Sequence, residues 1–180
     1  MSLWNIVLSG YPGSGKTKLA QHLVSDNEDF VRLNVDDLRS MYFGTTEPSK
    51  QEDFVYDTLV TLRDVALRSG LSVVIDTTAP DNNMRDLLLS TRMRNVTQLL
   101  ILLVVDKSIL EDRNRKRQLI GAVQAWEKVW QSPSKNLPVM KFRNNSSAEF
   151  ETNYYVLTDL LKSKVHPFKR RFFTHIYPRI

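Results

Sequence analysis

The residues GYPGSGKT at positions 10–17 combine the types and the spacing that hold a polyphosphate. They match the pattern G-x-x-x-x-G-K-[ST] at every fixed position, and they lie between an apolar run and a helical pattern, as this motif requires. Glycines let the backbone approach an anion closely, and successive N–H groups at a helix N-terminus complete the anion site. The sequence therefore predicts a loop that binds the phosphates of a nucleoside triphosphate.

The polar side chains of this loop have separate expected roles. The Lys16 ammonium is expected to reach the β- and γ-phosphates, and the Thr17 hydroxyl is expected to ligate Mg²⁺. ATP and Mg²⁺ are therefore the expected cofactors, although kinases, NTPases and nucleotide switches share this loop. The residues predicted to bind the nucleotide are Gly10, Gly13, Ser14, Gly15, Lys16 and Thr17.

The stretch NVDDLR, at positions 34–39, gathers two aspartates and an arginine at the predicted end of a strand. If Asp36 starts a helix, Arg39 lies three residues on and shares its face. Asp36 is then predicted to take the proton of an acceptor hydroxyl, and Arg39 to clamp an acceptor phosphate with its bidentate fork. Asp37 is predicted to be the cap of that helix rather than the base.

Two further groups complete the predicted site. Asp76 closes the apolar run of VVIDTT and is expected to hold Mg²⁺ through water or to orient Arg39. Arg113 and Arg117, in EDRNRKR, would share a helix face and are predicted to neutralise charge that develops on the transferred group. This basic run would otherwise be a solvated face or a polynucleotide-binding stripe. The predicted catalytic set is Lys16, Asp36, Arg113 and Arg117.

Strands and helices alternate along the chain and must position these residues. The strands lack polar alternation, which is typical of a parallel sheet that is buried on both faces. The sequence therefore predicts an α/β fold with its ligand-binding groups at the carboxyl ends of the strands. Strands are expected at 4–9, 30–35, 71–76 and 96–105, and helices at 16–26, 49–70 and 149–164, from 81 and from 107.

The clearest helical pattern covers residues 49–70. Ser49 is a candidate cap with Glu52 three residues on, and Gly70 is expected to end the helix. Apolar residues at helical spacing predict which face of this helix packs on the sheet. The expected core-facing stripe is Phe54, Thr58, Leu62, Val65 and Ala66.

One domain is expected, because 180 residues of which 42% are hydrophobic can bury one good core. Residues 1–130 are predicted to form the core of this domain, with a helical lid at about 107–130. Residues 131–180 are predicted to be a linker, a helix and a basic C-terminal extension of the same domain. The expected linker is residues 131–150, which are rich in Ser, Asn and Pro.

Charge is divided unevenly between two parts of the chain. Residues 1–106 carry 10 basic and 14 acidic side chains, whereas residues 107–180 carry 15 basic and 6 acidic ones. This polarity indicates a polyanionic partner such as nucleic acid on the C-terminal side, or a solvated basic tail. Residues 168–179 mix basic with aromatic residues, and Trp126 and Trp130 lie four residues apart. These aromatic side chains are expected to stack on bases or to pack within the fold.

The sequence has no cysteine, which excludes disulfides, thiolate metal sites and cysteine catalysis. Its three histidines show no ligand spacing, so no metal site beyond Mg²⁺ is predicted. The N-terminus lacks the pattern of a signal peptide, and no apolar run reaches the length of a membrane span. A cytoplasmic protein without a membrane partner is therefore expected.

Four motifs in this order resemble the bacteriophage-type and end-healing polynucleotide kinase domains, a branch of the P-loop phosphotransferases. The matching stretches are GYPGSGKT, NVDDLR, VVIDTT followed by APDNNMRD, and RNRKR, and they cover about residues 4–130. The resemblance implies a P-loop kinase fold, with a parallel sheet of four to five strands, helices on both faces and a helical lid. It also implies that Asp36 is the general base, that Arg39 contacts an acceptor phosphate, and that Arg113 and Arg117 are lid arginines.

The resemblance implies a reaction on nucleic acid. The expected activity is transfer of the γ-phosphate of ATP to a hydroxyl of a polynucleotide, with the 5′-hydroxyl end as the leading acceptor and DNA favoured over RNA. A second acceptor is the hydroxymethyl group of 5-hydroxymethyluracil in phage DNA, which similar phage enzymes phosphorylate and which must leave the base stack. The sequence also fits a small-molecule kinase acting on a nucleotide, sugar or antibiotic, and a nucleotide-dependent binding module. DTTAP here replaces the usual D-x-T-N-like sequence of the family.

Overall fold

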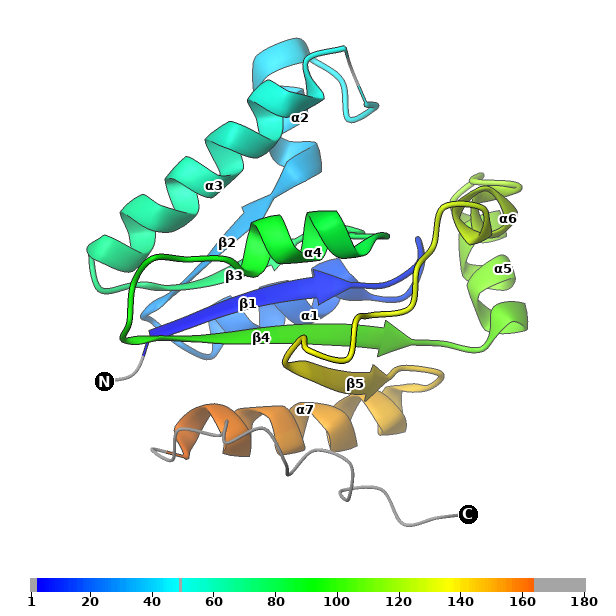
Figure 1. Cartoon of the computed structure of the whole chain (residues 1–180). Coiled ribbons are helices and arrows are strands. Elements are labelled where there is room, and N and C mark those ends of the chain that lie inside the picture. Colours follow the sequence, from blue (N-terminus) through cyan, green and yellow to red (C-terminus); the bar gives the residue numbers. More distant parts are fainter. Residues whose placement is uncertain (1–2, 49, 164–180) are drawn as a thin grey trace.

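A computed structural model describes residues 3–48 and 50–163 of the chain (Figure 1). Its strands form one parallel sheet in the order β2-β3-β1-β4-β5, so the first strand lies at the centre. This sheet, with helices on both faces, confirms the predicted α/β fold class. The strands are β1 (Leu3–Ser9), β2 (Phe30–Asn34), β3 (Ser72–Asp76), β4 (Val96–Val104) and β5 (Val139–Arg143).

The helices are divided between the two faces of the sheet and one end of it. α1 and α7 cover one face, α2, α3 and α4 pack on the other, and α5 and α6 stand beyond the carboxyl end of β4 (Figure 1). No helix within the described ranges is long and apolar enough to cross a membrane. The helices are α1 (Lys16–Ser25), α2 (Val35–Phe43), α3 (Glu52–Arg68), α4 (Asn82–Leu89), α5 (Lys107–Lys116), α6 (Ala122–Glu127) and α7 (Ser147–Lys162).

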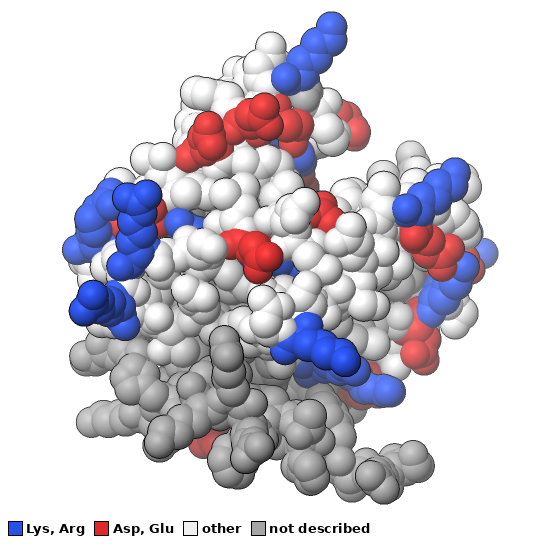
Figure 2. Space-filling model, in the orientation of Figure 1, with Lys and Arg blue, Asp and Glu red and all other residues white. Residues whose placement is uncertain are grey.

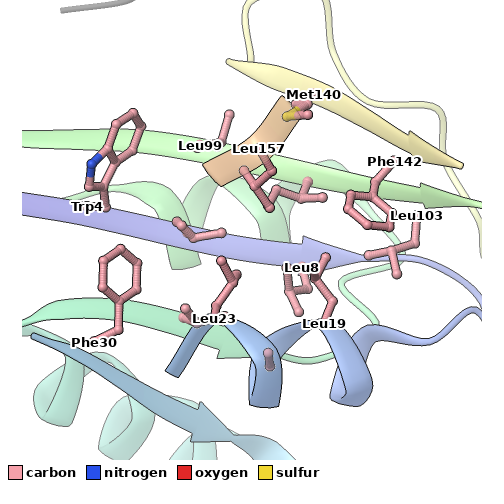
Figure 3. Close-up of a cluster of buried hydrophobic side chains, with 14 of the residues drawn as sticks. Trp4, Leu8, Leu19, Leu23, Phe30, Leu99, Leu103, Met140, Phe142 and Leu157 are labelled. Atoms are coloured by element: carbon pink, nitrogen blue, oxygen red, sulfur yellow. The ribbon is translucent and has the colours of Figure 1, made fainter. Parts of the chain in front are cut away.

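Successive residues of β1 enter opposite cores, because side chains alternate across a strand. Ile6 and Leu8 belong to the cluster between the sheet and α1 and α7, which Figure 3 shows. Leu3 and Val7 belong to the cluster between the sheet and α2, α3 and α4. Burial on both faces explains the absence of polar alternation in the sequence of this strand, and it fixes the loop that follows β1 in the middle of the molecule.

The buried stripe of α3 differs from the prediction by a rotation of the helix. The buried side chains are Val55, Leu59, Arg63 and Leu67, whereas the predicted Phe54, Leu62 and Val65 are 52%, 37% and 47% exposed. Because the buried stripe contains an arginine, Arg63, its sequence pattern is that of a polar, exposed face. The Arg63 guanidinium is satisfied there by the carbonyl groups of Leu87 and Leu88, at 3.1 and 2.9 Å. The helix begins after Gln51, and the predicted cap Ser49 lies outside the described residues.

Part of the predicted linker is a strand of the sheet. Residues 139–143, within the predicted linker 131–150, form β5 and pair in parallel with β4. In β5, Met140 and Phe142 are buried and Lys141 is exposed, an alternation that suits the edge of a sheet. Pro138 before this short strand and Asn144 after it gave the segment the composition of a loop.

Candidate active site

The phosphate-binding loop predicted at residues 10–17 joins β1 to α1. Gly13 and Gly15 have φ angles of 81° and 97°, which only glycine adopts readily. Gly15 is the N-cap of α1, and no side-chain capping bond is made at this helix end. The Lys16 ammonium donates to the carbonyl groups of Gly10 and Tyr11, at 2.8 and 3.1 Å, and so lies folded over the loop.

Three successive carbonyl groups of this loop are held from outside by side chains. The donors come from α5 and from the turn between β5 and α7. Two of them, Asn114 and Asn144, are 2% and 6% exposed. The bonds are Asn114 Nδ2 to Pro12 O at 2.8 Å, Arg113 Nη1 to Gly13 O at 3.3 Å, and Asn144 Nδ2 to Ser14 O at 2.7 Å.

The residues of the loop fit a polyphosphate. A Cβ atom at Gly10 would lie 2.7 Å from Ser14 Oγ, and one at Gly15 would collide with the Asn144 amide, so the backbone must be bare there. Within the described part of the chain, Ser14 Oγ and Asn114 Oδ1 are buried without a hydrogen-bond partner. Thr17 is exposed at the start of α1, where its hydroxyl is free to meet a cation beside the phosphates.

The predicted pair Asp36 and Arg39 lies on one face of α2. Arg39 Nη1 donates to Asp36 Oδ1 at 2.6 Å, and the Asp36 side chain is 59% exposed while that of Arg39 is only 10% exposed. Glu52, at the start of α3, accepts two further bonds from Arg39, at 3.0 and 2.6 Å. The sequence indicated Glu52 only as a partner of a helix cap, and nothing in its local pattern points to Arg39.

The cap of α2 is Asn34, not Asp37 as predicted. The Asn34 side chain accepts a bond from the Asp37 backbone N–H at 2.8 Å, which leaves the Asp37 carboxylate outside the capping interaction. That carboxylate pairs with Arg32 at 2.7 Å. Asparagine and aspartate are equally good caps, and the position at which β2 ends decides between them.

Asp76 is 2% exposed at the end of β3. Its Oδ2 accepts bonds from Arg32 Nε and Nη2, at 3.0 and 2.8 Å, and from Asn34 Nδ2 at 3.0 Å. The expectation that Asp76 orients Arg39 is therefore wrong, because Asp76 pairs with Arg32 and Arg39 pairs with Glu52. All of these bonds reach one carboxylate oxygen, Oδ2. That Asp76 holds Mg²⁺ through water stays a prediction.

The pKa of Lys16 is influenced by the charges of three other predicted site residues. Burial lowers its pKa from the usual 10.5 to about 8, while the negative charges of Asp76 and Asp36 oppose this shift and the positive charge of Arg117 adds to it. The charges of three predicted site residues therefore act on the loop lysine, although they belong to segments that are far apart in the sequence. An anionic ligand at Lys16 would restore the ammonium form.

The two lid arginines do not form the shared helical face that was predicted. α5 ends at Lys116, and Arg117 is its C-cap, because the Arg117 backbone N–H turns back to Asn114 O. Arg113 points to the loops instead, with Nη2 donating to Asn144 O at 2.8 Å and Nη1 to Gly13 O. Arg117 remains exposed and is the one whose charge reaches Lys16.

Trp130 packs on the phosphate-binding loop. Its ring stacks on that of Tyr11 with 4.5 Å between the centroids, and the guanidinium of the fully buried Arg85 lies 4.9 Å from the centroid of the Trp130 ring. This packing was one of the two roles predicted for the tryptophan. Arg85 donates to backbone carbonyl groups of Ala79, Pro80 and Gln131 at 2.9, 2.9 and 2.7 Å.

The surface is hollowed between the α2–α3 part of the molecule and the α5–α6 part (Figure 2). Acidic side chains gather over α2 and α3, whereas basic and acidic side chains mix over α5. Among the residues in these two parts, Asp36, Asp53 and Arg117 are exposed. The basic tail predicted to contact a polyanion, residues 164–180, lies outside the described residues.

Known structures share this fold. The APS kinase CysC of Mycobacterium tuberculosis, in complex with AMPPNP and APS, is 20% identical with a TM-score of 0.68, over 91% of this chain and 100% of that one. A sugar kinase from Janibacter sp. HTCC2649 is 16% identical with a TM-score of 0.63, over 88% of this chain and 95% of that one. These likenesses confirm the predicted P-loop kinase fold.

A chain of the Pnkp1/Rnl/Hen1 complex is 25% identical, with a TM-score of 0.55, over 62% of this chain and 38% of that one. No curated protein matches the sequence. A family described as an AAA domain, AAA_33, matches residues 6–138, which include the phosphate-binding loop, Asp36, Asp76 and both lid arginines. The chain therefore belongs to this AAA-domain family of P-loop proteins and has the fold of P-loop kinases.

Proposed function

We propose that the protein is a kinase that transfers the γ-phosphate of ATP to a hydroxyl of a polynucleotide, with the 5′-hydroxyl end as the leading acceptor. The single observation that carries this proposal is the contact of 2.6 Å between Asp36 and Arg39. A carboxylate that can take a hydroxyl proton lies beside a guanidinium that can bind a phosphate. An acceptor that carries both groups, as a nucleic acid end does, matches that pair.

The nucleotide side of the reaction depends on residues of the loop. ATP with Mg²⁺ supplies the γ-phosphoryl group. The N–H groups at the start of α1 and the Lys16 ammonium hold its phosphates, and Thr17 and Asp76 are the residues that would hold the metal. Arg117, which is exposed and electrostatically coupled to Lys16, neutralises charge on the transferred group.

The acceptor side depends on Asp36 and Arg39. Asp36 takes the proton of the acceptor hydroxyl while that oxygen bonds to the γ-phosphorus and the bond from phosphorus to the ADP oxygen breaks. Arg39 keeps its two bonds to Glu52 and exchanges its bond to Asp36 for one to an acceptor phosphate. The arriving acceptor therefore frees the base that the reaction needs.

A second candidate is a kinase for a small molecule such as a nucleotide or a sugar. It is favoured by the acidic surface over α2 and α3 (Figure 2), which repels a polyanion. The APS kinase and the sugar kinase are also matched over 100% and 95% of their own length, whereas chains of the Pnkp1/Rnl/Hen1 complex are matched over 38% and 46% of theirs. The base hydroxyl of 5-hydroxymethyluracil is a third acceptor for the same Asp36 chemistry.

A labelling experiment separates these acceptors. ATP labelled at the γ-phosphate and Mg²⁺ would be offered with a 5′-hydroxyl oligonucleotide, with a 5′-blocked oligonucleotide containing 5-hydroxymethyluracil, and with a pool of nucleotides and sugars. We expect label on the first acceptor, falling steeply as salt rises from about 50 to 200 mM, because counterions are released on binding. Label in the pool alone, with little dependence on salt, would overturn the polynucleotide assignment.

A further inference from the structure

The phosphate-binding loop is shaped by side chains that lie outside the motif. A peptide group is planar and trans, so the carbonyl of one residue and the N–H of the next point in opposite directions. Fixing the carbonyl on one side of the loop therefore fixes the N–H on the other side. The bonds from Asn114, Arg113 and Asn144 fix three successive peptide groups in this way, with their carbonyl oxygens outward.

The three peptide groups differ in what their N–H groups do. The middle one, between Gly13 and Ser14, directs its N–H to Tyr11 O at 3.1 Å, so it closes a turn within the loop. The other two carry the N–H groups of Gly13 and Gly15, which make no such bond among the described loop contacts. These two are the ones that Asn114 and Asn144 hold, at 2.8 and 2.7 Å.

We propose that Asn114 and Asn144 are positioning residues, which turn the Gly13 and Gly15 N–H groups toward the phosphates of the bound nucleotide. This role rests on the nucleotide binding proposed above and extends it to two amides that touch only the protein. Both are buried, and neither carries a charge that would compete with Lys16 for the ligand. A left-handed glycine can flip its peptide at little cost, so an unbraced loop would lose this orientation.

The two amides reach the loop from different parts of the fold. Asn114 lies on α5, within the predicted lid, so the position of the lid and the shape of the loop are linked. Asn144 follows β5 and lies outside residues 6–138, the segment that matches the AAA-domain family. The contact between Asn144 and Ser14 spans 130 residues of sequence. Part of the nucleotide site therefore comes from the segment that the sequence indicated as a linker.

Calorimetry with the full-length chain tests this role through binding alone. The dissociation constants of Mg-ADP and of AMP would be measured for the wild type, Asn144→Ala and Asn114→Ala. We expect the constant for Mg-ADP to rise about 10-fold in each variant, the size of one lost bond to a charged ligand. The constant for AMP should change less than about 2-fold, because a nucleoside monophosphate draws less on the loop amides. Asn136→Ala, an exposed position in the same segment, is the matched control.

A purely structural role would weaken Mg-ADP and AMP alike and would lower the melting temperature, which overturns the assignment. Asn144→Asp keeps the volume but replaces the donor by a carboxylate, which repels Ser14 O and the phosphates, so it should weaken Mg-ADP binding more than Asn144→Ala does. A measurement on the wild type covers the case in which a variant fails to fold. The ¹⁵N–¹H resonances of Gly13 and Gly15 should shift on adding Mg-ADP, and unchanged resonances would overturn the role. None of these readouts needs an acceptor, so they stand apart from a failure of the kinase assignment.

Discussion

The phosphate-binding loop and the acceptor side of the site are held in place by different kinds of interaction. Side-chain amides and one guanidinium bond to backbone carbonyl groups around the loop. On the acceptor side, two arginines pair with carboxylates, Arg39 with Asp36 and Glu52, and Arg32 with Asp76 and Asp37. The loop is thus braced mostly by neutral amides, while the charges on the acceptor side are balanced before any ligand arrives.

This difference implies that the two sides of the site bind their ligands in different ways. Around the loop, burial disfavours the charged form of Lys16, and a bound anion would stabilise that form. The free loop therefore favours an anionic ligand such as a nucleotide. On the acceptor side, a ligand must exchange one ion pair for another, so binding there depends on what the ligand carries. In the proposed reaction, selectivity for the acceptor follows from the exchange at Arg39.

The largest effect that would sharpen this contrast is expected from Asp36→Asn. The amide cannot take a proton, so the rate of transfer should fall by about 10²-fold or more, while the dissociation constant for ATP stays near its wild-type value. Single-turnover transfer and calorimetry measure the two quantities. Asp37→Asn, next to it and paired with Arg32, should lower the rate by less than about 5-fold. Near-normal transfer by the Asp36 variant would remove this residue as the base.

The next effect is expected from Arg39→Ala. We expect the KM for the acceptor to rise by about 30-fold, which corresponds to about 2 kcal/mol for a lost bond between charged groups. The dissociation constant for ATP should be almost unchanged, because Arg39 faces Asp36 and Glu52 rather than the loop. Arg68→Ala, which changes an exposed arginine at the end of α3, is the control. A loss confined to ATP affinity would contradict the acceptor role.

A smaller effect is expected from pH on the nucleotide alone. The folded-state pKa of Lys16 is about 8, below the usual 10.5, so the free protein loses this proton as pH rises through about 8. ATP binds the ammonium form, and its dissociation constant should therefore rise about 10-fold between pH 7 and 9. Calorimetry at pH 8 in buffers of different ionisation enthalpy should detect uptake of about half a proton. A constant affinity across this range would show that Lys16 is already charged.

The lowered pKa of Lys16 also affects stability, and there a rise in pH is favourable, whereas it weakens nucleotide binding. The unfolded chain binds more protons than the folded one between about pH 8 and 10.5, so the Lys16 contribution makes the protein more stable as pH rises through this window. Burial of the Lys16 charge therefore weakens the fold at neutral pH, although its ammonium donates to the carbonyl groups of Gly10 and Tyr11.

The smallest effect is expected from Phe54→Ala, at the exposed end of α3. Its ring contacts only the partly exposed Tyr42 among the described aromatic side chains, so the free energy of unfolding should fall by less than about 1 kcal/mol. Leu59→Ala, on the buried stripe of the same helix, should cost about 2–5 kcal/mol. Urea denaturation of both variants measures the difference. A larger loss from Phe54→Ala than from Leu59→Ala would place the predicted stripe, and not the observed one, against the sheet.

Much of the fold was predictable because its signals are local. Strands that are buried on both faces appear as apolar runs, and the glycine-rich loop carries its own pattern, so the first four strands and α1 were placed close to their observed bounds. The close approach of Asp36 and Arg39 was predictable as well, since residues three apart on a helix share a face. Their catalytic roles stay predictions until transfer is measured.

The partners of the site residues were not predictable, because distant segments supply them. Glu52 is 13 residues from Arg39, and Asp76 is 44 residues from Arg32. The Arg32–Asp76 pair is decided by the pairing of β2 with β3, and the Arg39–Glu52 pair by where α3 lies on the sheet. A single sequence does not encode either in a local pattern. Asn144 gave no signal at all, since an asparagine after a short edge strand has the composition of any turn.

The place of β5 in the sequence also sets an order for synthesis. A ribosome makes the phosphate-binding loop early and reaches Asn144 only 130 residues after Ser14. Until then a nascent chain has the loop sequence but not the Asn144 bond to it, and the buried face of Leu99 lacks the neighbours from β5 and α7 that complete its cluster. If Asn144 has the proposed positioning role, tight nucleotide binding requires that β5 has already docked on the sheet. A chain that ends before β5 exposes apolar surface of this cluster, which chaperones and proteases recognise.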